Sequence, residues 1–201
     1  MKNVMSKLKI DPIFIDSVLA KDLESTPKEE FVKRGIITSD AKIKMSELAC
    51  ALSHIKTLMH FVDENTKNCL ILEDDIDSNF NLETLKNKLS DIFEHLKGSY
   101  QFLNFGRCFG NCCFDRKISD NLAECIKPFC LHAYSVSSEY AKLILKEIFP
   151  LSKPLDYEIL NLKKRYRTRF YCSTPWLFVQ KREEVPSTLR DGQTDLPECI
   201  C

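Results

Sequence analysis

Residues 69–75 read Cys-Leu-Ile-Leu-Glu-Asp-Asp, four apolar side chains followed by three carboxylates. A continuous apolar run of this kind is typical of a β-strand that is covered on both faces. Three carboxylates at the end of a buried strand repel one another and resist the loss of water. They are stable there when a cation binds them or when the strand end opens into a cleft. The stretch therefore predicts a buried strand that leads into a polar site.

Helical and extended patterns alternate on both sides of this strand. Residues 46–62 carry apolar side chains at alternating spacings of four and three, which predicts a helix with one apolar stripe. The stripe consists of Leu48, Leu52, Ile55, Met59 and Val62. The opposite face is small and uncharged, so we expect this helix to be covered on both sides.

The remaining segments follow the same alternation. We expect helices over residues 1–8, 82–96 and 138–149 and after Pro154, and strands over residues 13–15, 101–105, 129–136 and 174–180. Strands that alternate with helices predict an α/β fold. The chain length of 201 residues fits one domain, which we expect over residues 1–182, followed by a polar tail over residues 183–201.

The charge balance and the hydropathy exclude several classes of protein. Lys and Arg number 29, and Asp and Glu also number 29, so the net charge is zero. A general nucleic-acid binder carries a basic excess, so we expect no nucleic-acid partner. No apolar run approaches the roughly 18 residues of a spanning helix, and the N-terminus does not resemble a signal peptide. We expect a cytoplasmic protein without a transmembrane segment, and peripheral contact with a membrane stays open.

The ten cysteines make up about 5% of the chain, below the roughly 8–10% that marks a disulfide scaffold. With no signal peptide in view, we expect reduced thiols. A zinc site at Cys108, Cys112 and Cys113 is the lesser alternative, because the usual spacing of tetrahedral zinc ligands is absent.

The three carboxylates are the first candidate for chemistry. In an extended chain Glu73 and Asp75 face one side and Asp74 faces the other. Open α/β sheets bind ligands at the carboxyl ends of their strands. Mg²⁺ and Mn²⁺ sites commonly use one or two carboxylates and complete the coordination shell with phosphates and water. The alternative is a solvated acidic loop that caps the following helix.

The context of these carboxylates resembles a known family. Residues 46–54, Ser-Glu-Leu-Ala-Cys-Ala-Leu-Ser-His, followed by residues 69–75, resemble glycosyltransferase family 25. This family includes bacterial lipopolysaccharide and lipooligosaccharide sugar transferases and collagen galactosyltransferases. Further matches are Phe-Leu-Asn-Phe-Gly-Arg at residues 102–107, His-Ala-Tyr at 132–134 and Pro-Leu-Asp at 154–156.

The chain departs from the family pattern at two places. Ser46 and Ala49 stand where the family usually has glycine. The family opens with a strand of the type Val-Ile-Asn-Leu, whereas this sequence starts inside the helix that follows it. We therefore expect the first strand to be missing, with either a true start upstream or a donor site that has lost a part.

The resemblance implies a GT-A-like fold with a mostly parallel sheet flanked by helices. It also implies a UDP-sugar donor and a Mn²⁺ ion, or Mg²⁺, at the acidic triplet. Asp75 and Glu73 would be metal ligands, with His132 as the third ligand or as a packed core residue. Glu73 would also contact the substrate. Asp74 would orient the donor sugar or the water shell of the metal.

Three more residues take roles from the same resemblance. Ser53 and His54 would lie on a helix that supports the nucleotide, although a lone helix histidine is also often a packed residue. Asp156 is the candidate general base, because an inverting transfer needs a carboxylate beside the attacking hydroxyl. Its alternative is an N-cap of the following helix.

Taken together, the sequence predicts a transferase that moves a hexose, galactose or glucose, from a UDP-sugar to a glycan or a hydroxylated protein. The alternative is a degenerate member that has lost activity and acts as a binding or scaffold protein. A metal-dependent phosphohydrolase ranks third, because no nucleophile is evident beside the carboxylates.

Overall fold

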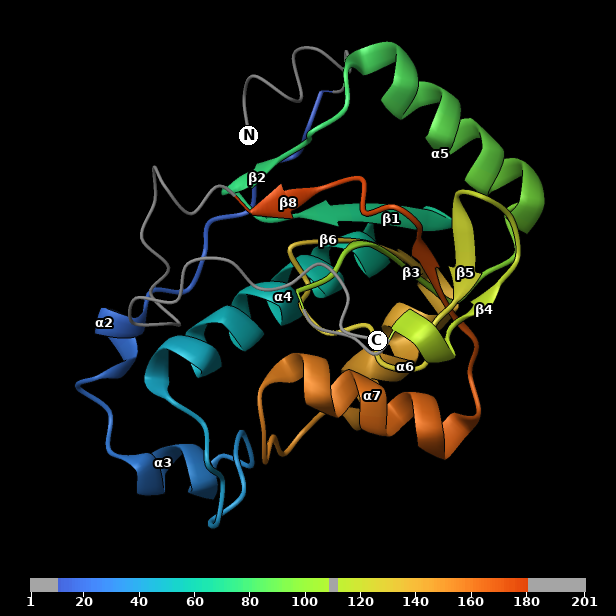
Figure 1. The fold of residues 1–201 in the computed structure, drawn as a ribbon. Coiled ribbons are helices and arrows are strands. Elements are labelled where there is room, and N and C mark those ends of the chain that lie inside the picture. The colour runs from blue at the N-terminus through green and yellow to red at the C-terminus, as the bar shows by residue number, and fades with distance from the viewer. Residues whose placement is uncertain (1–10, 109–111, 181–201) are drawn as a thin grey trace. The chain divides into compact units, whose positions relative to one another are not determined.

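The described strands and most of the described helices fall into different parts of this chain. The computed structural model describes residues 11–108 and 112–180. It divides the chain into a first unit of Met1–Ile13, Asn68–Ser137 and Arg169–Cys201, and a second unit of Phe14–Lys67 and Ser138–Thr168. The described strands all belong to the first unit (Figure 1). The expected helix over residues 1–8 and the tail over residues 183–201 lie outside the described residues, and the single-domain organisation stays a prediction.

The first unit contains a six-stranded sheet in the order β1-β6-β3-β7-β5-β4. The strands in this order are Asn68–Leu72, Ala133–Ser137, Phe102–Gly106, Phe170–Ser173, Leu122–Glu124 and Arg116–Lys117. Among these described strands, the β3–β7 pair is parallel and the other neighbouring pairs are antiparallel. The α/β class is confirmed, and the expected mostly parallel sheet is wrong. Alternation of strands and helices does not determine pairing, and β6 enters between β1 and β3 and runs antiparallel to both.

β1 confirms the strand predicted from the apolar run, but the strand is not buried on both faces as expected. It is an edge strand of the six-stranded sheet, paired with β6 so that Ile71 lies opposite Tyr134. Ile71 is buried, whereas the side chain of the neighbouring Leu70 is 38% exposed. Burial of a strand depends on its neighbours, and the sequence of β1 alone does not show them.

Helix α5, Leu82–Leu96, packs on one face of this sheet and has the predicted bounds. Its N-cap Asn81 accepts a hydrogen bond from the Thr84 N–H at 2.9 Å, which satisfies a free donor of the first turn. After the helix, Lys97 and Gly98 adopt positive φ angles, a common way to end a helix. The core on this face includes Leu85, Ile92, Leu96, Leu103, Phe105 and Phe178.

The opposite face of the sheet carries aromatic side chains. Phe102 stacks on Tyr134 of β6 and on Phe170 of β7, with ring centroids 5.2 and 4.5 Å apart. Leu103 and Phe105 belong to the α5 side, because successive residues of a strand point to opposite faces. The strand predicted over residues 101–105 is confirmed, and both of its faces are buried.

A short second pair of strands lies beside the acidic triplet. β2, Ile76–Asp77, pairs antiparallel with β8, Val179–Gln180, so that Ile76 lies opposite Gln180. The strand predicted over residues 174–180 is therefore confirmed only at its last two positions, in β8, because β7 ends at Ser173, before the predicted range. Ser78 strengthens this junction, since its hydroxyl donates to the Leu177 carbonyl at 2.8 Å.

The second unit is helical, and its longest helix is α4, Met45–Asp63. Helices α6, Ser138–Glu147, and α7, Leu155–Tyr166, pack against α4 and against each other. α4 confirms the predicted helix, but its buried face differs from the predicted apolar stripe. Leu48 and Ile55 are buried as expected, whereas Met59 is 55% exposed. Leu58 takes the inward position instead. The unit also contains the short helices α2, Ala20–Leu23, and α3, Lys28–Lys33.

The strand expected over residues 13–15 is wrong. This segment has no regular secondary structure, and Ile13 and Phe14 are 69% and 62% exposed. An apolar triplet beside a proline is too short to specify a strand unless another strand pairs with it.

The expectation of reduced thiols is also wrong. Disulfides join Cys108 to Cys130 and Cys125 to Cys172, with Cα atoms 5.7 and 5.9 Å apart. Cys113 is disulfide-bonded too, which removes the predicted zinc alternative, because a metal binds the thiolate form. The antiparallel pairing of β5 with β7 creates the second bond by placing Cys125 diagonally across from Cys172. Disulfides persist in oxidising compartments, and the cytoplasmic location stays a prediction.

Peptide mapping under non-reducing conditions tests these pairs. We expect linked peptides for Cys108–Cys130 and Cys125–Cys172, while Cys50 and Cys69 react with an alkylating reagent as free thiols. Replacing both Cys125 and Cys172 with alanine should lower the free energy of unfolding by about 2–4 kcal/mol, as the 47-residue separation suggests. Complete alkylation of all cysteines in protein refolded under air would contradict the pairing.

Candidate functional site

The acidic triplet occupies the turn between β1 and β2. The Glu73 N–H donates to the His132 carbonyl at 2.8 Å, which extends the β1–β6 ladder by one bond. The side chains of Glu73 and Asp75 are half-buried and accept hydrogen bonds from one amide group, whereas Asp74 is exposed. This arrangement agrees with the alternation predicted from the sequence.

Asp75 is the most perturbed carboxylate of the triplet. Burial, followed by the charges of Glu73 and Asp74, raises the pKa of Asp75 to about 6 from its ordinary value of 3.8. Its Oδ1 atom is buried and has no hydrogen-bond partner among the described residues. A buried carboxylate oxygen without a partner is costly. Beside two further carboxylates, it fits a divalent cation with oxygen ligands.

Gln180 completes this cluster and was not predicted. Its Nε2 atom lies 3.0 Å from Asp75 Oδ2 and 3.3 Å from Glu73 Oε2. β8 brings it to the site by pairing with β2, more than 100 residues away along the chain. A glutamine in a short apolar segment gives no local signal of such a role.

His132 supports the site through its main chain and packs its ring in the core. The side chain is 3% exposed, with Nε2 3.4 Å from the Phe178 carbonyl and Nδ1 3.9 Å from Cys108 Sγ. Gly106 faces this ring closely, and a Cβ atom at that position would overlap His132 Nε2 and the Phe178 carbonyl. These contacts agree with the packed-histidine alternative, and the metal-ligand role stays a prediction.

Arg107, the last residue of the matched 102–107 segment, forms a buried ion pair. Its Nη2 atom lies 2.5 Å from Asp115 Oδ2, and both side chains are 4% exposed. Both charges are shielded from water, so separating them would leave each one buried without a partner, which is strongly destabilising. The pair fixes the chain that leaves β3 against the segment after the 3₁₀ turn Cys112–Phe114.

Ser53 and His54 lie on α4 in the second unit. The Ser53 hydroxyl accepts from the Val18 N–H and donates to the Ala49 carbonyl, both at 2.8 Å. It thus attaches the extended segment before α2 to the helix. His54 is 5% exposed. Their substrate-binding roles stay predictions.

Asp156 lies in the first turn of α7. The N-cap position belongs to Pro154, so the predicted N-cap alternative for Asp156 is wrong. Its Oδ1 atom accepts from the Tyr157 N–H at 2.9 Å, and the side chain is half-exposed. A carboxylate in the first turn also interacts favourably with the helix dipole. The general-base role stays a prediction.

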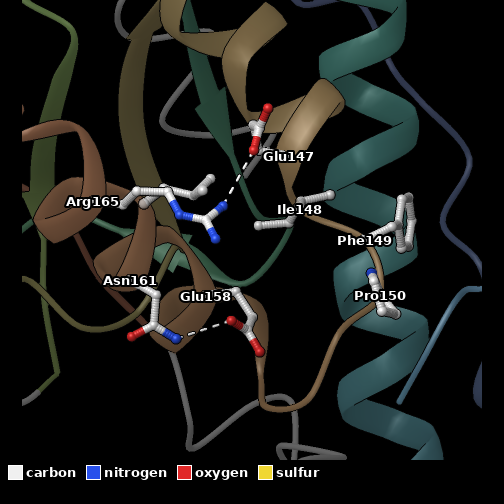
Figure 2. A pocket seen from close by; sticks show the side chains of 8 residues that line it. Glu147, Ile148, Phe149, Pro150, Glu158, Asn161 and Arg165 are labelled. Carbon is white, nitrogen blue, oxygen red and sulfur yellow. Dashed lines mark hydrogen bonds and ion pairs between the residues drawn. The ribbon is translucent and has the colours of Figure 1, made fainter.

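The second unit also contains a hollow of about 320 Å³ between the end of α6 and α7. Figure 2 shows two polar pairs on its wall: Arg165 with Glu147, 3.2 Å apart, and Asn161 with Glu158, 3.0 Å apart. Ile148, Phe149 and Leu162 supply the apolar part. None of the predicted site residues lines this hollow, and its polar groups largely satisfy one another.

The first unit thus contains a mixed sheet with a cluster of carboxylates after an edge strand. The model of glycosyltransferase family 25 (LPS biosynthesis protein) matches residues 1–153. The match takes in most of the chain, and the chain belongs to this family. The predicted resemblance is confirmed, and the matched region contains the triplet, Ser53, His54 and His132 but ends before Asp156.

Comparison with individual proteins adds little to the family assignment. No curated protein matches this chain. Among solved structures, the crystal structure of apo UDP-glucose pyrophosphorylase is similar at a TM-score of 0.40 and 9% identity, over 90% of this chain and 70% of that one. A TM-score of this size does not establish a shared fold, so the GT-A-like fold stays a prediction.

The described part of the chain contains no helix that is both long and apolar enough to cross a membrane.

The metal-free stability of Asp75→Asn tests the electrostatics of the triplet. Because the pKa of Asp75 in the folded chain is about 6, its ionisation costs stability as the pH rises from about 4 to about 6. A shift of this size corresponds to about 3 kcal/mol, which solvent screening at a half-buried side chain reduces to about 1–2 kcal/mol. Without metal, Asp75→Asn should therefore be more stable than the wild type above pH 6, and the difference should disappear near pH 4.

The control is Asp120→Asn, at an exposed carboxylate that pairs with Lys117. Urea unfolding at several pH values measures the difference. An Asp75→Asn variant that is less stable than the wild type at pH 7 would show that the ionised carboxylate is well supported without a cation.

Proposed function

We propose that this family member transfers a hexose, galactose or glucose, from a UDP-sugar to a glycan or a hydroxylated protein acceptor. We further propose that Mn²⁺ or Mg²⁺ bound at Glu73 and Asp75 takes part. The observation that carries the proposal is the buried Asp75 Oδ1 atom, without a partner among the described residues and beside the Glu73 carboxylate. It lies in the segment that matches the family.

The proposed role of each carboxylate follows from its position. Glu73 and Asp75 would hold the cation, which when bound neutralises the charge that develops on the leaving diphosphate. The exposed Asp74 would orient the donor sugar. Ser53 and His54 are proposed to support nucleotide binding, and His132 stays a candidate third ligand.

Asp156 is the proposed general base. In the transfer, the acceptor oxygen forms a bond to the anomeric carbon, the bond from that carbon to the diphosphate oxygen breaks, and UDP departs. The proton of the acceptor hydroxyl would go to the Asp156 carboxylate. Its side chain is half-exposed in the first turn of α7, and its Oδ1 atom accepts from the Tyr157 N–H.

A thermal titration with UDP, with and without Mn²⁺, tests the donor site. Ligand at about 100 times its dissociation constant should stabilise the fold by roughly 2.7 kcal/mol, which for a chain of this size raises the melting temperature by about 5–10 °C. We expect this shift with both ligands together, and its loss in Asp75→Ala but not in Asp120→Asn. Release of UDP from UDP-galactose or UDP-glucose then identifies the sugar.

The same titration distinguishes the alternative function. A protein that shows no shift with UDP and Mn²⁺ has no working donor site, and the inactive scaffold becomes the better description. A shift that survives in Asp75→Ala would place the cation elsewhere.

The Asp156→Asn variant tests the general base. Asparagine keeps an oxygen for the Tyr157 N–H but cannot accept the proton, so we expect kcat to fall by about 10²- to 10⁴-fold. The UDP and Mn²⁺ thermal shift should stay unchanged. Asp63→Asn, at the exposed end of α4, is a matched control. Normal turnover in Asp156→Asn would assign the base to another residue.

A further inference from the structure

The Gln180 side chain contacts two carboxylates of the triplet at once. Its amide nitrogen carries two N–H donors, and both carboxylates can only accept when they are ionised. With Asp75 Oδ2 at 3.0 Å and Glu73 Oε2 at 3.3 Å, one amide serves both side chains. The chemistry also fixes the orientation of the amide, because the reverse would turn its carbonyl oxygen toward two negative charges.

The other end of the Gln180 amide rests on a disulfide. Its Oε1 atom lies 3.7 Å from Cys108 Sγ, which is bonded to Cys130 and has no proton to donate. The contact between Gln180 Oε1 and Cys108 Sγ is therefore van der Waals packing and not a hydrogen bond. The main chain of Gln180 is also fixed, because β8 pairs with β2 directly after Asp75. The side chain is held at both ends.

We propose that Gln180 is a positioning residue for the cation site at Glu73 and Asp75. Two like charges would otherwise move apart, and the amide draws one oxygen of each toward a single group. This leaves Asp75 Oδ1 free of hydrogen bonds to the described residues and able to bind the cation. Gln180 thus acts through the two carboxylates. The inference rests on the proposed function, since it needs a cation at the triplet.

The test compares Mn²⁺ binding to the wild type, Gln180→Met and Gln101→Met. Methionine keeps the length of the side chain and removes the donors. Gln101, exposed just before β3, is the matched control. The electron paramagnetic resonance signal of free Mn²⁺ gives the dissociation constant without any turnover. We expect it to rise about 10-fold in Gln180→Met, which is typical for loss of a residue that orients metal ligands, and to stay unchanged in Gln101→Met.

The outcomes separate this inference from the proposed function. Failure of the wild type to bind Mn²⁺ would overturn the metal part of the proposed function and this inference with it. Binding by the wild type with an unchanged or tighter constant in Gln180→Met would overturn the inference alone.

A measurement on the wild-type side chain covers the case in which Gln180→Met does not fold. In nitrogen-15 spectra, the Gln180 side-chain amide signals should shift on addition of diamagnetic Mg²⁺. They should also shift in Asp75→Asn, but not in Asp120→Asn. Amide signals that respond to neither change would overturn the inference.

Discussion

The half-buried carboxylates after β1 are the constraint on which the arrangement of the first unit depends. Ionised side chains repel one another and resist the loss of water, so Glu73 and Asp75 stay together only where other groups support them. That support comes from segments far apart in the sequence. The main chain of His132 fixes the turn, and the short β2–β8 pair brings in an amide from the end of the described chain. The apolar layer between α5 and the sheet holds these segments in register.

The sequence predicted the elements whose signals are local. Helix α5 has the expected bounds because Asn81 supplies its N-cap and Gly98 follows its end. β1 and α4 were also predicted, but the cover of β1 and the inward face of α4 were not, as Leu70 and Met59 show. Burial depends on which element lies alongside, and no local pattern contains that information. The prediction of a mostly parallel sheet was wrong for the same reason, since strand order is a property of the whole chain.

The features of the candidate site also differ in whether a local stretch of sequence could predict them. The triplet and the family could be recognised from contiguous motifs, and the family match confirms the latter. Gln180 and the Cys125–Cys172 disulfide could not, because their partners lie 105 and 47 residues away. His132 shows a third case. Its position beside the site was predicted, whereas the packing of its ring against Phe178 became visible only in three dimensions.

The order of the chain has a practical consequence for dissecting the protein. The polypeptide passes between the two units four times, at 13/14, 67/68, 137/138 and 168/169. A fragment of residues 68–137 would lack β7, which lies between β3 and β5, and would leave both of those strands with an unpaired edge. Simple truncation therefore exposes unpaired strand edges, which promote aggregation. Isolating the first unit calls for a circularly permuted or spliced gene, in which β7 and β8 are rejoined to the strands with which they pair.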